Sequence, residues 1–400
     1  MKSISLHFTL LLTTLLTVVC SLNAHQTETE NSVEKLSKGN TSFAVDLYHK
    51  LRTAEGNIFF SPYSISSVMG MVYGGSHGNT EEEIRRVLNF SQDQNSLHAS
   101  FKKLNKKLIR TASEQDQVLR IANGLCLTGE NELSEDFKDL LKRYYDAEVF
   151  DGDLEKINSW VNHKTEGKIE QILESLNPYS VAVLLNAIYF NGTWDEEFDT
   201  DKTHDAPFYV SPERQSNASL MYRKGHYRYL GSDRFKVVSI PYKGEAVSMV
   251  VLLPTEKYGL EELEEQFTPK TLSFILSELD SQIPQEIELY FPKFDLETEY
   301  NLKSVFQKLG ISDAFRYGEA DFSGMGWPKG ELWISQIKHN AAIDVNEEGT
   351  EAAAATAVEF RTVSIRNYPQ FRADHPFLFL IRDNQTGSIL FMGRVTDPVR

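Results

Sequence analysis

The sequence is poor in the residues that cross-link a fold. Its 400 residues contain two cysteines, Cys20 and Cys126. Cys20 lies in an N-terminal run that reads as a signal peptide, so a processed chain would keep Cys126 alone and could form no internal disulfide. Cys126 stands between two leucines, and we expect a buried, unreactive side chain there.

Motifs of catalysis and metal binding are missing as well. The sequence has no His-Glu-x-x-His, no Cys-x-x-Cys, no Gly-x-Ser-x-Gly and no phosphate-binding loop, and its ten histidines are scattered. A Ser-His-Asp triad stays open at this point, because its members need not be neighbours in sequence. The missing motifs predict no metal and no cofactor. We also predict no enzyme activity, and turnover of generic ester substrates would be the test for a triad.

Positive charge is in short supply. Lys and Arg number 41 against 57 Asp and Glu, for a formal charge of −16. Nucleic acids are bound through basic surfaces, so they are excluded as the main partner. No Pro/Gly/Ser-rich linker or internal repeat divides the chain, and 41% hydrophobic residues suffice for a core. We expect one monomeric domain over residues 25–400, although chains of this length often form two.

The chain begins with a short apolar run. Met1-Lys2 precede apolar residues through Cys20, small or polar residues follow, and Ala24 suits the last position before cleavage. The run is too short for a membrane span and lacks a stop-transfer flank. It predicts a signal peptide over residues 1–24, a secreted, extracellular protein and no membrane attachment. Five sequons would be glycosylation sites on this route, with Asn191 the least accessible: Asn40, Asn89, Asn191, Asn217 and Asn384.

Periodicity and capping signals place several elements. Thr80 with Glu83 three residues later predicts a capping box at a helix start. Residues 180–190 are nearly all apolar, which predicts a strand buried on both faces. Further helices are expected over residues 31–52, 97–111, 134–147 and 302–310. Further strands are expected over residues 237–242, 247–253 and 287–292, with a closing hairpin over 377–394.

The stretch Glu347–Val358 carries contradictory local preferences. Its four alanines, residues 352–355, favour a helix. The flanking runs Leu332–Ile337 and Val358–Ile365 favour strands. A surface helix capped near Gly349 is one interpretation. The other is a segment that can adopt two structures, because its preferences are nearly balanced.

This stretch and Phe371–Phe379 together resemble the hinge and C-terminal signature of the serpins, a family of serine protease inhibitors. Other stretches similar to the family occur in the same order, at residues 57–67, 157–169, 186–194 and 320–324. The resemblance covers about residues 30–400. It implies an α+β serpin fold with a large central mixed β-sheet, further sheets, about nine helices and an exposed reactive loop over about residues 347–371.

The resemblance implies inhibition as a suicide substrate. A target serine protease would attack the loop and form a covalent acyl-enzyme, and the hinge would then insert into the main sheet as a new strand. The small hinge side chains favour an inhibitor over a non-inhibitory carrier or storage serpin, because an inserted charge at Thr350 would have to be desolvated. The implied hinge residues are Glu347, Gly349, Thr350, Glu351, Ala352, Ala353, Ala354 and Ala355.

Counting places the reactive bond. In the family the bond follows the seventeenth residue from the hinge glutamate, which from Glu347 gives Val363–Ser364. A small β-branched residue at this point favours an elastase-like target. Cleavage at Arg361–Thr362 or Arg366–Asn367 would instead make the target trypsin-like. The sequence leaves these alternatives open.

His339 lies eight residues before Glu347. The resemblance implies that it joins Ser61, Ser64 and Asn186 in a polar cluster under the main sheet. Buried polar groups must be hydrogen-bonded, so such a cluster would hold the sheet closed yet separable. A generic hydrogen-bonded core histidine is the alternative.

Residues 97–111 predict an amphipathic helix with a basic face. Phe101, Leu104 and Leu108 recur at helical spacing on the core side. A solvated surface is the simpler interpretation of the other side. The resemblance adds a second, because the corresponding helix of some serpins binds heparin-like glycosaminoglycans. The basic face consists of Lys102, Lys103, Lys106, Lys107 and Arg110.

Overall fold

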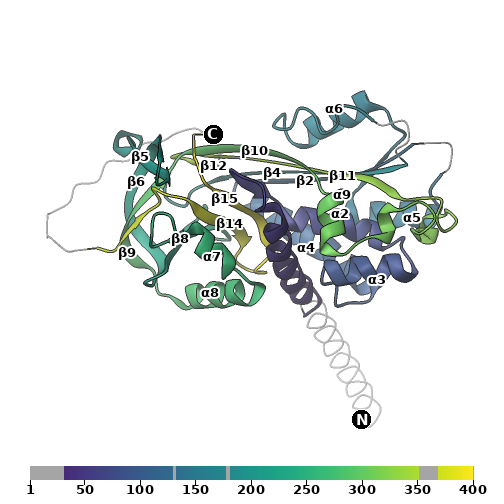
Figure 1. The fold of residues 1–400 in the computed structure, drawn as a ribbon, viewed down its shortest axis with the longest axis horizontal. Helices are drawn as coiled ribbons and strands as arrows, with labels where there is room; N and C mark the ends of the chain where they lie inside the picture. Colours follow the sequence, from purple (N-terminus) through teal and green to yellow (C-terminus); the bar gives the residue numbers. More distant parts are fainter. Residues whose placement is uncertain (1–30, 129–131, 177–180, 351–367, 400) are drawn as a thin grey trace, which may run out of the picture.

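Two β-sheets and the helices packed on them make up the described part of the chain (Figure 1). The structure, a computed structural model, describes residues 31–128, 132–176, 181–350 and 368–399. Within these ranges it has a first helix over residues 31–51 and eight labelled helices, which confirms the expected α+β class and the expected number of helices.

The elements are as follows. The labelled α-helices are α2 (Pro62–Tyr73), α3 (Gly78–Val87), α4 (Gln94–Glu114), α5 (Glu135–Leu140), α6 (Leu154–Lys164), α7 (Leu260–Glu265), α8 (Pro269–Ser281) and α9 (Lys303–Leu309). The strands are β1 (Ile58–Phe60), β2 (Val118–Leu127), β3 (Glu148–Phe150), β4 (Ala182–Thr193), β5 (His204–Ser211), β6 (Arg214–Gly231), β7 (Phe235–Pro241), β8 (Val247–Pro254), β9 (Gln285–Pro292), β10 (Phe294–Asn301), β11 (Ile334–Val345), β12 (Gly349–Thr350), β13 (Gln370–Arg372), β14 (Phe377–Asp383) and β15 (Ile389–Val395).

The six-stranded sheet is mixed, with strand order β10-β11-β4-β2-β3 and β12 added beside β4. β4 is parallel to β11 and antiparallel to β2. On one face α6 buries Ile157 and Val161 against β2 and β4, and α2 and α4 lie on the other face (Figure 1). Ala182–Phe190 is therefore buried throughout, as its nearly all-apolar sequence predicts.

The nine-stranded sheet has the order β1-β15-β14-β8-β7-β6-β9-β13, with β5 beside β6. The closing hairpin is confirmed, because β14 and β15 pair antiparallel. The hairpin of β7 and β8 is confirmed as well. α7 and α8 pack beside this sheet, near the lower left of Figure 1.

The predicted capping box at Thr80 is wrong. α3 begins at Gly78, and His77 before it makes no side-chain capping bond. The Thr80 hydroxyl and the Glu83 carboxylate accept hydrogen bonds from backbone N–H groups beyond α9 at 2.7 to 3.0 Å, from Ser312, Asp313 and Asp321. Tertiary contacts thus take the groups that the local motif would have used.

The helix expected over residues 134–147 changes its winding midway. Ser134 caps α5 as predicted, since its Oγ accepts from the N–H of Phe137 at 3.4 Å. α5 then passes into a π-helix over Leu141–Tyr145, which ends at Asp146 in the left-handed region with φ of 49°. The π-helix packs against α4.

Candidate functional site

The short strand β12 is the centre of the site. After β11 the chain reverses, with the N–H of Asn346 donating to the carbonyl of Gly349 at 2.9 Å. Gly349 and Thr350 then pair antiparallel with the end of β4. β4 and β11 pair directly only as far as Tyr189 and Ala342. β12 therefore occupies the position where the two strands have separated.

Gly349 is required at its position by close backbone approach. A Cβ atom there would lie 2.3 Å from the carbonyl oxygen of Gly192 and 2.6 Å from the Cα of Thr193. Its φ of 151° also lies in a region that residues with a side chain rarely adopt and glycine adopts readily. A hinge residue predicted from the resemblance thus has a direct steric reason.

Thr350 is anchored under the sheet by residues that the sequence did not single out. Its side chain is buried, and its Oγ1 lies 2.9 Å from the Tyr242 hydroxyl. Burial raises the pKa of Tyr242, so the hydroxyl keeps its proton for this bond. The Tyr242 ring stacks on Trp194 at 4.6 Å, and the Trp194 indole donates to the carbonyl of Asn346 at 3.0 Å.

Glu347 holds the start of the hinge. Its carboxylate pairs with Lys293 at 2.7 Å and accepts from the Thr203 hydroxyl at 2.8 Å, with 9% of the side chain exposed. Burial opposes its charge, but the hydrogen bonds from Lys293 and Thr203 prevail and lower the pKa of Glu347. Its carbonyl accepts from the N–H of Phe198 at 2.8 Å. The hinge is therefore fixed by both side chain and backbone.

The expected exposed loop over residues 347–371 is wrong at both ends. The chain is built into the six-stranded sheet through Thr350 and into the nine-stranded sheet from Gln370, where β13 pairs with β9. Phe371 is fully buried. The remaining hinge and reactive-bond predictions lie outside the described residues: Glu351, Ala352, Ala353, Ala354, Ala355, Arg361, Thr362, Val363, Ser364, Arg366 and Asn367.

The structure brings the four residues of the polar cluster together. His339 and Asn186 are opposite each other in the β11–β4 pair, with 2.6 Å between Nδ1 and Oδ1. The backbone N–H of Ser61 donates to Nε2 of His339 at 3.1 Å, so Nδ1 carries the imidazole proton. The Asn186 amide donates to the Ser64 hydroxyl at 2.6 Å. All four residues are fully buried.

The cluster is larger than the sequence indicated, and it carries no formal charge. The Asn186 amide also donates to Asn123 Oδ1 at 2.9 Å, and the Asn123 amide donates to the Ser67 hydroxyl at 3.2 Å. Asn123 lies on β2, so only the β2–β4 register reveals it. Burial lowers the pKa of His339 to about 3, which keeps the imidazole neutral. The cluster thus joins β2, β4, β11 and α2 without a formal charge.

The basic face lies along α4 as predicted. Lys102, Lys103, Lys106 and Arg110 are exposed, and Lys107 is half-buried. Arg110 pairs with Glu114 at 3.6 Å. The four lysines make no ion pair with any residue that the structure describes, and Lys102 lies 5.8 Å above the Tyr144 ring. Their charges are therefore not offset by neighbouring carboxylates there.

The sequons differ in accessibility. Asn40 is 1% exposed inside the first helix, and its Oδ1 accepts from the Ser66 hydroxyl at 2.7 Å. A glycan on the folded chain at Asn40 is therefore excluded, because the amide has no path to solvent. Asn191 is half-buried, whereas Asn89, Asn217 and Asn384 are exposed.

Ser323, His77 and Asp321 lie together near the surface but do not form a catalytic triad. Ser323 Oγ is 3.4 Å from Nδ1 of His77 and donates to the Asp321 carboxylate at 2.7 Å. In a triad the carboxylate orients the histidine, whereas here it bonds the serine. Among the described residues there is also no group of three or more metal-binding side chains. No helix in the same ranges is long and apolar enough to cross a membrane.

Comparison with known proteins agrees with this geometry. Residues 38–398 match the serpin family, described as serine protease inhibitors. Serpin B6 of Pongo abelii is 37% identical over 382 residues, covering 92% of this chain and 100% of the relative. The leukocyte elastase inhibitor of Homo sapiens is 37% identical over 393 residues with the same coverage.

Solved structures show the same fold. Maspin is 27% identical with a TM-score of 0.83 and covers 92% of this chain and 100% of its own. Serpin48 of the insect Tenebrio molitor is 31% identical with a TM-score of 0.80, covering 91% and 98%. Serpins are protease inhibitors rather than catalysts. The chain accordingly belongs to the serpin family of serine protease inhibitors and is not an enzyme.

Proposed function

We propose that the protein traps a serine protease as a suicide substrate. The protease cleaves the reactive loop and forms an acyl-enzyme, and the cut loop inserts between β4 and β11. The observation that carries this proposal is β12, whose two residues already pair with β4 where β11 has separated from it. Insertion needs only to continue a strand that has begun.

The register of β12 predicts where each following side chain would point. Thr350 faces the core under the sheet, and successive residues of a strand alternate between faces. Ala352, Ala354 and each further even-numbered residue up to Thr362 would therefore enter the core, and none of these is charged. The charged residues between 351 and 363 all fall at odd positions, facing outward: Glu351, Glu359 and Arg361.

Insertion exchanges one strand interface for two. The parallel pairing of β4 with β11 would be lost, together with the bond between His339 and Asn186. An inserted strand would be antiparallel to both neighbours, as β12 is to β4. Continuing that register would place Thr356 opposite Asn186, so a further hydroxyl would reach the polar cluster. The cluster would therefore remain hydrogen-bonded when the sheet opens.

The class of target protease depends on which bond of the reactive loop is cleaved. Cleavage at Val363–Ser364 would select an elastase-like protease, and the names of the leukocyte elastase inhibitors among the relatives support this choice. Cleavage at Arg361–Thr362 or Arg366–Asn367 would select a trypsin-like protease. Mass spectrometry of the released C-terminal fragment distinguishes the three bonds after incubation with each class of protease.

A covalent complex that survives denaturing electrophoresis is the expected result. Ala352→Glu and Ala353→Glu form a matched pair, because the first would place a charge in the core and the second on the outer face. Ala352→Glu should be cleaved without trapping, and Ala353→Glu should still trap. Cleavage of the natural protein by every protease without a complex would instead identify a carrier or storage serpin.

The basic face supports a second function, the binding of heparin-like glycosaminoglycans. Its four lysines, which make no ion pair with a described residue, set a local charge opposite to the net −16, and attraction acts within a Debye length of roughly 10 Å. Heparin should retain the protein on a column above physiological salt. Replacing Lys103, Lys106, Lys107 and Arg110 with glutamine should abolish retention. If the glutamine variant eluted at the same salt concentration as the natural protein, the basic face would be a solvated surface and not a heparin site.

We also propose secretion, glycosylation and a monomeric state. Secretion rests on the N-terminal run, Met1–Ala24, and predicts a mature chain beginning at His25. The exposed sequons at Asn89, Asn217 and Asn384 would carry the glycans. Expression in eukaryotic cells tests both: the medium should contain a protein that starts at His25 and shifts on glycosidase treatment. Retention of the whole chain inside the cells would contradict secretion.

A further inference from the structure

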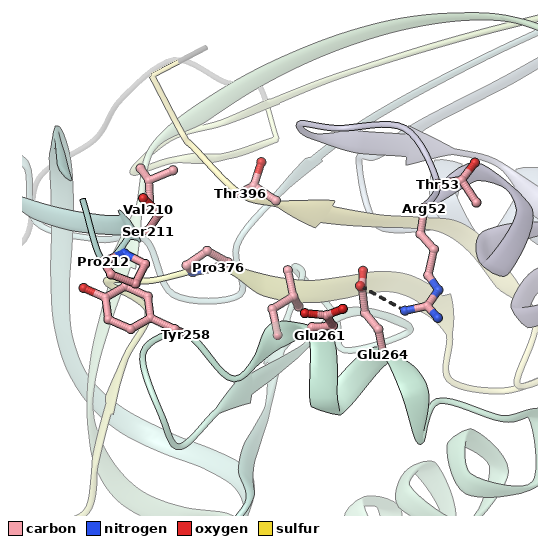
Figure 2. A pocket seen from close by; sticks show the side chains of 11 residues that line it. Arg52, Thr53, Val210, Ser211, Pro212, Tyr258, Glu261, Glu264, Pro376 and Thr396 are labelled. Carbon is pink, nitrogen blue, oxygen red and sulfur yellow. Dashed lines mark hydrogen bonds and ion pairs between the residues drawn. The ribbon is translucent and has the colours of Figure 1, made fainter. Parts of the chain in front are cut away.

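A second site, separate from the hinge and the polar cluster, is a pocket of about 500 Å³ beside α7 (Figure 2). Its walls come from the end of the first helix, the turn after β5, α7 with the loop before it, and the residues flanking β14 and β15. This volume lies within the range of about 300–1,000 Å³ typical of small-molecule sites. The inhibitory mechanism makes no use of it.

One end of the pocket carries opposite charges. Arg52 pairs with Glu264 at 3.3 Å, and Glu264 is almost fully buried, with a second ion pair to Arg394 at 3.0 Å. The Glu264 charge is thus paired within the protein, and its contact with Nη1 of Arg52 holds that side chain at the wall of the pocket. Glu261 lies one helical turn before Glu264, exposed, and forms no ion pair with any described residue. Figure 2 shows Glu261 next to the Arg52–Glu264 pair.

The other end is apolar. Tyr258 is 47% exposed, a large fraction for an aromatic side chain, and Figure 2 shows Pro212 and Val210 at the same end of the pocket. Pro376 is buried and lies between the two ends. An aromatic ring packs well on such a surface, because tyrosine and proline offer flat, rigid contact area.

We propose that this pocket binds a small aromatic zwitterion, the chemistry of an aromatic α-amino acid. Its carboxylate would accept from the Arg52 guanidinium, and its ammonium group would donate to the Glu261 carboxylate, both as charge-assisted hydrogen bonds. Its ring would lie on Tyr258 and Pro376. A ligand with a single charge would contact only Arg52 or only Glu261, and a ligand without a ring would make no contact at the apolar end.

Isothermal titration calorimetry of the full chain with L-tryptophan tests the proposal. We expect saturable binding at one site. N-acetyl-L-tryptophan lacks the ammonium charge and L-tryptophanamide lacks the carboxylate, and each should bind at least tenfold more weakly. L-alanine, which has the two charges without the ring, should show no saturable binding.

Two matched variants locate the ligand. Glu261→Gln should weaken L-tryptophan at least tenfold and leave N-acetyl-L-tryptophan unchanged, because only the ammonium group contacts Glu261. Glu262→Gln, at an exposed neighbour outside the pocket, should change neither. Tyr258→Ala should weaken both aromatic ligands, and thermal unfolding confirms that each variant is folded. Absence of saturable L-tryptophan binding, equal affinity for the three tryptophan ligands, or equal effects of the two glutamate variants would each overturn the proposal.

Discussion

Acid should weaken the native state through His339. Its pKa is about 3 in the folded protein, where burial disfavours the imidazolium, against about 6.5 in an unfolded chain. The unfolded chain therefore binds the proton more readily. The stability due to neutral His339 is complete above about pH 6.5 and is lost as the pH falls through 6.5 toward 3. A proton on Nε2 would also remove the acceptor for the Ser61 N–H.

The size of the effect follows from the shift in pKa. Each unit is worth about 1.4 kcal/mol, so the complete loss is about 5 kcal/mol, of which about 2.5 kcal/mol is lost by about pH 4.5. His339→Gln removes this titration but keeps a neutral polar side chain. Between about pH 7.5 and pH 4.5 the natural protein should lose about 2.5 kcal/mol more unfolding free energy than the variant.

Urea unfolding at the two pH values measures this difference. The cost of the substitution itself appears at both values and cancels. So does the titration of His98, another histidine whose pKa burial lowers, to about 4. If His339→Gln lost as much stability in acid as the natural protein, His339 would not titrate as its burial requires.

The hinge yields three further predictions. Thr350→Arg should convert the inhibitor to a substrate, because an unpaired charge buried beside Tyr242 costs several kcal/mol. The protease should then cleave the variant without forming a complex. An unchanged yield of complex would contradict this. Gly349→Ala should displace β12, because the added Cβ would lie 2.3 Å from the carbonyl oxygen of Gly192. The Trp194 amide donates to the carbonyl of Glu348, so its hydrogen exchange should become at least tenfold faster. Unchanged protection would mean that the strand tolerates a side chain. Cutting the chain between Ala355 and Ser364 should raise the melting temperature. The freed segment would gain strand hydrogen bonds that outweigh its ordering cost of about 1–2 kcal/mol per residue. A lower or equal melting temperature would mean that the cut segment does not insert.

The sequence predicted local structure correctly wherever no tertiary contact competed for the same side chains. The nearly apolar run over residues 180–190 predicted a strand buried on both faces, and Ala182–Phe190 of β4 is buried throughout. The capping box at Thr80 failed because the same hydroxyl and carboxylate found partners beyond α9. Asn40 matched a sequon by its own residues, yet helix packing buried it. A local motif specifies what a side chain can do, and its neighbours in space decide what it does.

What the sequence by itself determined is several of the helices and strands and the chemical character of the hinge, small and uncharged at Gly349 and Thr350. Only the tertiary structure decided that these two residues join β4, that Tyr242 and Trp194 hold them, and that Glu347 pairs with Lys293. Only the register of β2 beside β4 added Asn123 to the polar cluster. These partners lie far apart in the chain, and strand register and packing, which depend on the whole sheet, bring them within hydrogen-bonding distance.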